Sequence, residues 1–258
     1  NSNSQFELHL LRATAYANQG DNNNAKESYL LAHALKPNNV RAINSLVILY
    51  LKQGNVEKSQ HFLDLSMSAN SQRASTWRLK GLLEKQQKQT ESALRSFQRA
   101  YELDPENPFV LRAYADGLWE AKLVPEAEVI VNKILLQTPN DPYAILLQSQ
   151  ILSASNKTQE AEEILGQLAQ DLTLMDAQTV ASNISLRFAS GMTAYLTNNY
   201  EQALSDIIYY VNNSNVEINT LGVLADTYIK LNKDRDALKL LESNEEIVTQ
   251  NLNIALLL

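Results

Sequence analysis

Few residues in this sequence have the types and spacings that catalysis or metal binding requires. Its histidines are His9, His33 and His61, which form no His-x3-His pair, and it has no cysteine. A metal site would therefore need ligands gathered from distant segments. The sequence also lacks a glycine-rich phosphate loop, a G-x-S-x-G motif and an H-E-x-x-H motif. We therefore predict that the protein is not an enzyme and has no catalytic residue, cofactor or metal ion.

Charge and hydropathy limit the class of partner. The net charge is −7 and the isoelectric point is about 5.1, whereas nucleic-acid binding needs a basic surface that neutralises phosphates. No run of about eighteen uncharged apolar residues is present, so we expect no membrane span in this segment. The absence of cysteine excludes disulfides but does not fix the compartment. A protein or peptide is the expected partner.

Small residues recur every 34 positions along the chain. They are Ala25, Ser59, Ala93, Ala127 and Ala161 and, after a shift of eight residues, Ala203 and Ala237. Four positions after each of them stands a bulky residue, such as Phe97 after Ala93. A fixed period in this range is typical of a solenoid built from repeated units.

The third unit has the most complete set of recurring residues. The set consists of Trp77, Gly81, Ala93, Phe97, Ala100 and Pro105. It resembles the tetratricopeptide repeat signature, W-x2-L-G-x2-Y followed by A-x3-F-x2-A and P, with Lys80 and Glu84 in place of the usual Leu and Tyr. The resemblance extends over nearly the whole chain. It implies an all-α fold, a right-handed superhelical solenoid of antiparallel helix pairs with about seven units and a partial eighth.

The spacing has a direct physical reason. Small residues where the two helices of a unit cross let the backbones approach, and the bulky residue one turn later fills the groove beside them. Trp77 stands at a signature position and is expected in the core. Asn107-Pro108 and Asp141-Pro142 place a capping side chain before a proline at the first helical position, and Pro125 should open a helix in the same way.

We place the units at 6–39, 40–73, 74–107, 108–141, 142–175, 184–217 and 218–251, forming one solenoid over residues 1–258. The eight extra residues fall within 172–190 and are expected to lengthen the first helix of the sixth unit. Residues 252–258 are apolar and look like the start of a further first helix. We therefore expect a fragment of a longer chain, with its apolar end a candidate surface for self-association.

The resemblance also implies where a ligand would bind. In a tetratricopeptide array the first helices line the concave surface, and the second, fifth, ninth and twelfth positions of each unit point into it. In the central units these positions bring together basic and aromatic residues, which are frequent binding anchors. The implied peptide-binding groove contains Arg41, Asn44, Arg78, Lys85, Phe109, Arg112, Trp119 and Tyr143. The alternative is an ordinary helix surface on which Trp119 packs against its neighbour.

Two refinements follow from the same positions. Some tetratricopeptide domains clamp a C-terminal carboxylate with Lys and Asn, but Leu10, Thr14 and Ile48 occupy the corresponding places here, so a receptor of that type is disfavoured. In the last two units the positions are more apolar and include Phe188, Met192 and Ile229, which would suit a hydrophobic helix or an oligomer contact.

The leading functional hypothesis is a non-enzymatic scaffold that binds a peptide or partner helix in this groove. The alternative is a regulatory or substrate-docking arm of a larger enzyme whose catalytic domain lies outside this sequence, and a third reading is a self-associating structural repeat. The Asn- and Gln-rich composition resembles bacterial cell-envelope tetratricopeptide proteins, including lipoproteins linked to PEP-CTERM/exosortase systems. That likeness implies a periplasmic location, while a cytoplasmic one is also compatible with the sequence.

Overall fold

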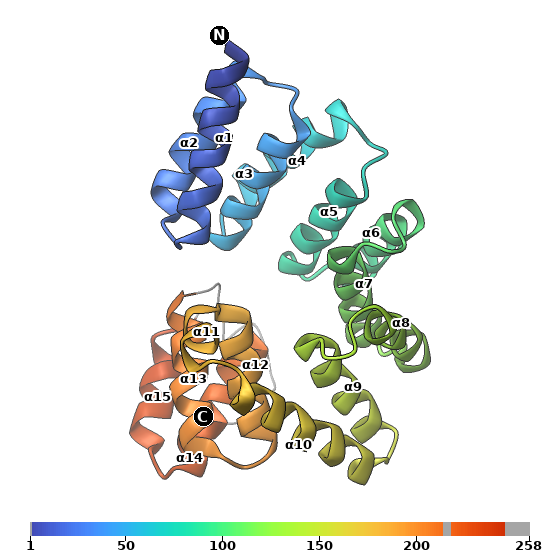
Figure 1. Ribbon diagram of the computed structural model, residues 1–258, viewed down its shortest axis with the longest axis vertical. Coiled ribbons are helices and arrows are strands. Elements are labelled where there is room, and N and C mark those ends of the chain that lie inside the picture. The colour runs from blue at the N-terminus through green and yellow to red at the C-terminus, as the bar shows by residue number, and fades with distance from the viewer. Residues whose placement is uncertain (1, 214–217, 246–258) are drawn as a thin grey trace. The chain divides into compact units, whose positions relative to one another are not determined.

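The computed structural model describes residues 2–213 and 218–245, and within these ranges it contains fifteen α-helices and no strand (Figure 1). The chain divides into two compact units, Asn1–Ile134 and Leu135–Leu258, which are described separately here. The all-α fold expected from the sequence is confirmed. The expected partial eighth repeat at 252–258 lies outside the described residues.

The N-terminal unit is a series of antiparallel helix pairs. Its helices are α1 (Ser2–Asn18), α2 (Asn22–Leu35), α3 (Val40–Lys52), α4 (Val56–Ala69), α5 (Ala74–Gln86), α6 (Thr90–Leu103), α7 (Pro108–Glu120) and α8 (Val124–Gln137), the last of which extends three residues beyond Ile134. Within it α1 packs on α2, α3 on α4 and α5 on α6, while the first helices α3, α5 and α7 contact one another in sequence.

The C-terminal unit repeats this pairing with one addition. Its helices are α9 (Pro142–Ala154), α10 (Thr158–Leu174), α11 (Ala177–Ser182), α12 (Ile184–Leu196), α13 (Tyr200–Asn213), α14 (Ile218–Lys230) and α15 (Asp234–Glu242). The pairs are α9 with α10, α12 with α13 and α14 with α15, and the short helix α11 packs on α12.

The small residues of the 34-residue period are all buried at the helix crossings, with at most 4% of their surface exposed. The bulky residue four positions later is also buried each time, and Phe97 is 1% exposed. Phe97 lies between two glycines, because a Cβ atom on Gly117 would come within 2.7 Å of its ring and one on Gly81 would also overlap it. The repeated small residues therefore provide the close approach that the sequence predicted.

Residues with positive φ mark the turn between the two helices of each pair. They are Gly20, Gly54, Lys88, Lys122, Asn156, Asn198 and Asn232, with φ between 57° and 77°. Successive members follow the same period as the small residues, except that the interval from Asn156 to Asn198 is longer. The eight additional residues therefore lie between these two turns.

The eight additional residues do not lengthen a first helix, so that expectation was wrong. Helix α12 has 13 residues, like α3, α5, α7 and α9, whereas α10 has 17 and is followed by the separate six-residue helix α11. Two caps interrupt the predicted long helix. The Asp176 carboxylate accepts a hydrogen bond from the Thr179 N–H at the start of α11, and the Asn183 side chain accepts one from Ser185 N–H at the start of α12. Capping side chains of this kind favour separate helix starts.

The proline-linked caps predicted from the sequence are confirmed. Asn107 accepts hydrogen bonds from the N–H groups of Phe109 and Val110, and Pro108 occupies the first helical position of α7. Asp141 caps α9 in the same manner, by accepting from the Ala144 N–H.

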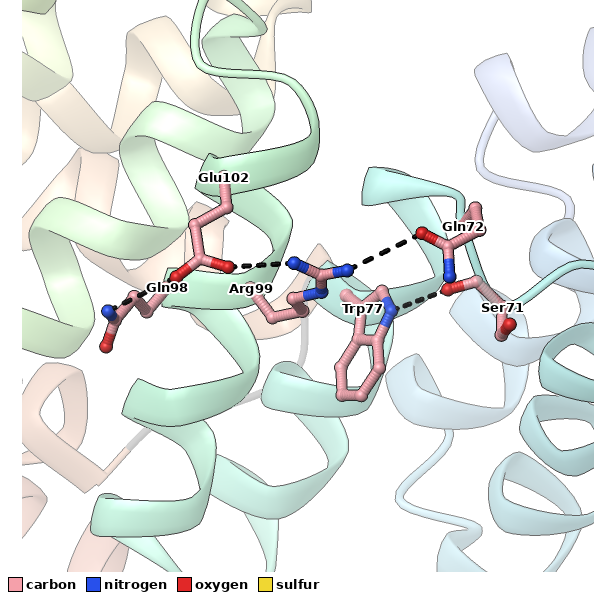
Figure 2. Close-up of polar contacts among 6 residues, drawn as sticks. All are labelled: Ser71, Gln72, Trp77, Gln98, Arg99 and Glu102. Carbon is pink, nitrogen blue, oxygen red and sulfur yellow. Dashed lines mark hydrogen bonds and ion pairs between the residues drawn. The ribbon is translucent and has the colours of Figure 1, made fainter.

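Trp77 packs against the buried residues Ala74, Ala100 and Val110, but it is half-buried. Its indole Nε1 donates a hydrogen bond to the carbonyl oxygen of Ser71, at 2.8 Å (Figure 2). The polar edge of the ring therefore reaches the loop before α5 while the apolar body contacts the core.

A short chain of polar contacts continues from this loop to α6. Figure 2 shows the Arg99 guanidinium between Gln72, 3.5 Å away, and Glu102, 2.9 Å away, and Gln98 donates to the other oxygen of Glu102. These contacts hold the loop before α5 against the outer side of α6.

Candidate functional site

Side chains at fixed positions link the first helices of the N-terminal unit. The Asn44 amide on α3 lies 3.3 Å from Ser75 Oγ on α5, and the Arg78 guanidinium on α5 lies 5.9 Å from the centre of the Phe109 ring on α7. Lys85 on α5 likewise forms an ion pair with Asp116 on α7. The two partners are separated by the same interval of sequence in all three pairs. This interval is three residues shorter than the repeat. A side chain on one first helix therefore contacts the side chain on the next first helix that stands three residues before its own equivalent.

Arg78 and Phe109 form an exposed basic and aromatic contact. Phe109 has 64% of its surface exposed. Arg78 is half-buried, and loss of solvent around its guanidinium lowers the pKa of that group. An arginine stays protonated at neutral pH all the same, so the site holds a partly desolvated positive charge. Such a charge attracts an anion more strongly than one in bulk water.

Lys85 is occupied by acidic partners on the next helix. Its ammonium group pairs with Asp116 and also lies 2.9 Å from Glu120 Oε1, and all three side chains are half-buried. Two carboxylates thus engage the ammonium group of Lys85. Lys85 therefore stabilises the contact between the two helices, and the sequence had indicated a basic ligand group there.

Asn44 also differs from the expectation, because it is 8% exposed. Its side-chain oxygen accepts a hydrogen bond of 2.6 Å from Ser66 on α4, and Ser66 in turn lies 3.0 Å from Thr76 on α5. Asn44 thus belongs to a buried polar cluster that joins α3, α4 and α5. A buried amide needs such partners, since leaving it unpaired is costly.

The remaining predicted residues lie at several places. Arg41 is exposed in the first turn of α3. Arg112 and Trp119 are half-buried on α7, Arg112 interacts with other residues of the chain, and the Lys122 ammonium lies 5.9 Å from the Trp119 ring. Tyr143 lies on α9, in the C-terminal unit.

The repeat register predicts that Arg41, Arg78, Phe109 and Trp119 share one surface, which we call the Arg–aromatic face. These residues come from the first helices α3, α5 and α7 of the N-terminal unit. They retain exposed or half-exposed basic and aromatic groups at successive helices, the composition from which protein-binding surfaces draw their anchors.

In the C-terminal unit, first helices are linked across the same sequence interval by a hydrogen bond where the N-terminal unit has a lysine–aspartate ion pair. The Tyr195 hydroxyl on α12 donates a 2.8 Å hydrogen bond to Asp226 on α14, across the same interval of sequence as the pairs of the N-terminal unit. Burial, with help from this carboxylate, raises the pKa of Tyr195. The apolar positions expected to bind a helix are partly used in packing, since the Phe188 ring lies 4.3 Å from that of Tyr210 and Met192 packs on the core.

The acidic partners of these contacts were missed by sequence reasoning. Asp116 and Asp226 stand at the ninth position of their repeats, which was treated as a ligand position. The signal that would have found them is the fixed offset between repeats, because it places Asp116 against Lys85 and Asp226 against Tyr195. Complementary residues at this offset mark contacts within the array.

Two kinds of site are not found in residues 2–213 and 218–245. No group of three or more His, Asp or Glu side chains is close enough together to hold a metal ion. None of the helices in these ranges has both the length and the hydropathy of a membrane span.

Comparison with known proteins identifies the repeats. Family models described as tetratricopeptide repeat match residues 6–39 and 85–151. A tetratricopeptide repeat protein from Parabacteroides merdae has a similar structure, with a TM-score of 0.60 at 16% identity, covering 98% of this chain and 96% of that one. PilF from Pseudomonas aeruginosa gives a TM-score of 0.59 at 17% identity over 81% of this chain and 91% of its own.

A third similar structure is PilW, described as a widely conserved type IV pilus biogenesis factor, with a TM-score of 0.60 at 14% identity over 79% of this chain and 91% of its own. At these identities the likeness concerns the fold. No curated protein sequence matches the chain.

Proposed function

We propose that this chain, which contains tetratricopeptide repeats, is a non-enzymatic scaffold that binds a peptide or partner helix on its Arg–aromatic face. The observation that carries the proposal is Phe109, 64% exposed, with the half-buried guanidinium of Arg78 beside it. This arrangement suits a ligand with an apolar group that covers the exposed Phe109 ring and an anionic group that neutralises the partly desolvated Arg78 guanidinium.

The charges of the face suggest the chemistry of its ligand. Arg41 and Arg78 lie toward the starts of their helices, whereas Lys85, nearer the end of α5, is already paired with Asp116 and Glu120. A peptide with a carboxylate near Arg78, an apolar side chain on Phe109 and a neutral residue farther along would complement this arrangement. The ligand class we propose is therefore an acidic–aliphatic peptide segment.

A selection experiment tests this proposal. A phage-displayed library of random dodecapeptides is panned against the whole chain, and the binding of the selected peptides is measured by fluorescence anisotropy. We expect enrichment of Asp or Glu next to Leu, Ile or Phe. Arg78→Ala and Phe109→Ala should each weaken binding by about tenfold or more, as is usual for central anchors.

Two matched variants control for nonspecific loss. Arg95→Ala removes an arginine of α6 whose side chain is 68% exposed, and Leu31→Ala removes an apolar side chain of α2 that is 51% exposed. Both should leave binding unchanged. Selected peptides that bind Arg78→Ala and Phe109→Ala as tightly as the unaltered protein would rule out this face as the site.

A further inference from the structure

A pocket of about 500 Å³ lies in the C-terminal unit among α10, α11, α12 and α13. This is where the 34-residue period is interrupted, because α11 and the extension of α10 occupy the additional residues. The volume is within the range of ordinary ligand sites. The pocket shares no residue with the Arg–aromatic face.

One wall of the pocket is aliphatic. Leu172 from the end of α10, Met175 from the connection, and Val180 and Ala181 from α11 all line it. Met175 is 42% exposed. The additional residues therefore supply an apolar wall that a regular repeat would not have.

The opposite wall is polar and is held in place by a buried carboxylate. Asp206 on α13 is 5% exposed and accepts hydrogen bonds from Arg187 Nε at 2.9 Å, Ser190 Oγ at 2.7 Å and Gln202 Nε2 at 2.6 Å. The Arg187 guanidinium also lies 4.0 Å from the centre of the Tyr209 ring. The wall is thus fixed in geometry, and the positive charge of Arg187 is balanced by Asp206.

Thr193 adds a polar group that has no partner. Thr193 lines the pocket and is 2% exposed, and its hydroxyl makes no hydrogen bond to any described residue. The equivalent residue of the third repeat, 110 positions earlier, is Leu83, which is 1% exposed. A buried hydroxyl without a partner lowers stability, whereas a leucine or valine there would not. The sixth repeat thus has a polar residue in the buried layer behind the pocket, where the third repeat has an apolar one.

We infer that this pocket binds an uncharged peptide segment that carries an aliphatic side chain of Val or Leu size. The aliphatic side chain would lie against Leu172 and Val180, and the peptide amides would face the amide group of Gln202 and the hydroxyl group of Ser205. The pocket is therefore a second binding site, which goes beyond the function proposed above.

Other ligand classes fit the walls less well. An anion such as phosphate would compete with Asp206 for Arg187, the one cationic residue lining the pocket. A sugar or nucleobase is usually held by stacking on an aromatic ring, and none of the lining residues is aromatic. The combination of neutral polar groups with aliphatic ones matches a peptide backbone and its side chain.

Chemical-shift perturbation in methyl-labelled protein tests the inference on the whole chain. The probes are the capped tripeptides acetyl-Ala-Leu-Ala-amide, acetyl-Ala-Glu-Ala-amide and acetyl-Ala-Lys-Ala-amide, together with inorganic phosphate. We expect the Leu peptide to shift the methyl signals of Leu172, Val180 and Thr193 and to bind at least tenfold more tightly than the two charged peptides.

Four variants make the result specific. Ala181→Trp fills the pocket from an exposed position of α11 and should abolish binding, while Ser182→Trp on the same helix, outside the pocket lining, should leave it unchanged. Thr193→Val removes a buried hydroxyl behind the pocket and keeps its shape, so it should leave binding unchanged without lowering the melting temperature. Arg78→Ala, on the Arg–aromatic face, should have no effect, so the two proposals can fail independently.

Several results would overturn the inference. These are equal binding of the three tripeptides, phosphate shifting the same signals, the absence of shifts at the highest peptide concentration, or unchanged binding by Ala181→Trp. Loss of binding in both Ala181→Trp and Ser182→Trp would equally count against a specific pocket. If Thr193→Val unfolds, the Trp pair still decides the outcome.

Discussion

The third repeat, α5 and α6, and the sixth repeat, α12 and α13, share one helix crossing but surround it with opposite chemistry. In both, a glycine meets the bulky residue of the period: Gly81 meets Phe97, and Gly191 meets Ile207. Around this crossing, Trp77 and Leu83 of the third repeat correspond to Arg187 and Thr193 of the sixth. The third repeat packs Trp77 and Leu83 against apolar neighbours and has a buried hydroxyl, Ser96, which donates to Glu84, whereas the sixth builds a larger polar wall around Asp206.

The two repeats also differ in which helix carries an aromatic residue and which carries an arginine. The third repeat has Trp77 on the first helix and Arg99 on the second (Figure 2), while the sixth has Arg187 on the first and Tyr209 on the second. The backbone crossing is set by the small and bulky residues, so the positions beside it are free to differ. The lesson is that function can vary in these repeats without a change of fold.

The largest expected effect concerns the shared crossing. Phe97→Ala should lower the free energy of unfolding by about 3–5 kcal/mol, because Phe97 is 1% exposed and its removal leaves a cavity between two glycines. Urea denaturation followed by circular dichroism measures this. Phe109→Ala, at a 64% exposed position, serves as the control and should change stability by less than about 0.5 kcal/mol. A loss below that of the control would show that the crossing does not depend on Phe97.

A smaller loss is expected when the polar wall of the sixth repeat is broken. Asp206→Ala leaves Arg187 without its carboxylate, which should cost about 2–3 kcal/mol, somewhat below a fully buried pair because the Arg187 side chain is 21% exposed. Replacing both residues by leucine should recover most of the loss, because neither charge is then left buried without its partner. The double variant is compared with Asp206→Ala by the same urea titration. A double variant that is less stable than Asp206→Ala would contradict this account.

Thr193→Val should have a still smaller effect, of opposite sign. Removing a buried hydroxyl without a partner should raise the free energy of unfolding by about 1 kcal/mol. Differential scanning calorimetry measures the change as a higher melting temperature. Leu83→Thr in the third repeat is the converse substitution and should lower stability, because Leu83 is 1% exposed in a core without polar partners. A lower melting temperature for Thr193→Val would remove the argument that its hydroxyl is unsatisfied.

The smallest expected effect is on the free energy of unfolding at alkaline pH, and it concerns Tyr195. Lys85 and Tyr195 hold equivalent positions, but Tyr195 donates its hydroxyl to Asp226, and burial raises its pKa. In the unfolded chain a tyrosine loses its proton near pH 10, before Tyr195 does in the folded protein. This contribution to stability is therefore complete below pH 10 and is lost as the pH rises above it.

Tyr195→Phe isolates that contribution. The free energy of unfolding of the unaltered protein should fall between pH 9.5 and 11 more steeply than that of the variant, as followed by urea titration at each pH. Tyr16→Phe is a suitable control, since it also removes one tyrosine hydroxyl and should not flatten the slope. Parallel slopes for Tyr195→Phe and the unaltered protein would contradict the prediction.

Much of the fold was predictable from the sequence, because the period of small residues reflects a packing requirement local to each repeat. Asn107-Pro108 likewise signals a helix start through chemistry confined to a few residues. The form of the eight-residue addition was not predicted, although Asp176 and Asn183 are capping residues that mark two further helix starts. Hydrophobic pattern alone did not distinguish one long helix from two short ones.

The candidate site was less predictable for a different reason. Arg78 and Phe109 were assigned to one face and do lie in contact, because both follow from the register of the repeat. The pairing of Lys85 with Asp116, and the burial of Asn44, depend on which side chain the next repeat offers. The role of Asp206 could not be predicted from the repeat pattern, because the equivalent residue of the third repeat is Ser96. The hydrogen-bond donors around Asp206 are evident only in the structure.

The left-handed residues between paired helices have a consequence for how such a chain changes in length. These residues recur at the same point of each repeat. A deletion that runs from one of these turns to the next therefore removes one whole repeat and leaves the order of first and second helices unchanged. Gain or loss of one repeat length would thus keep the helix order and register, and the pairs between successive repeats, such as Lys85 with Asp116, would be the contacts that change. The segment between Asn156 and Asn198 is the exception. Its replacement by a repeat of normal length would remove α11 and the pocket beside it.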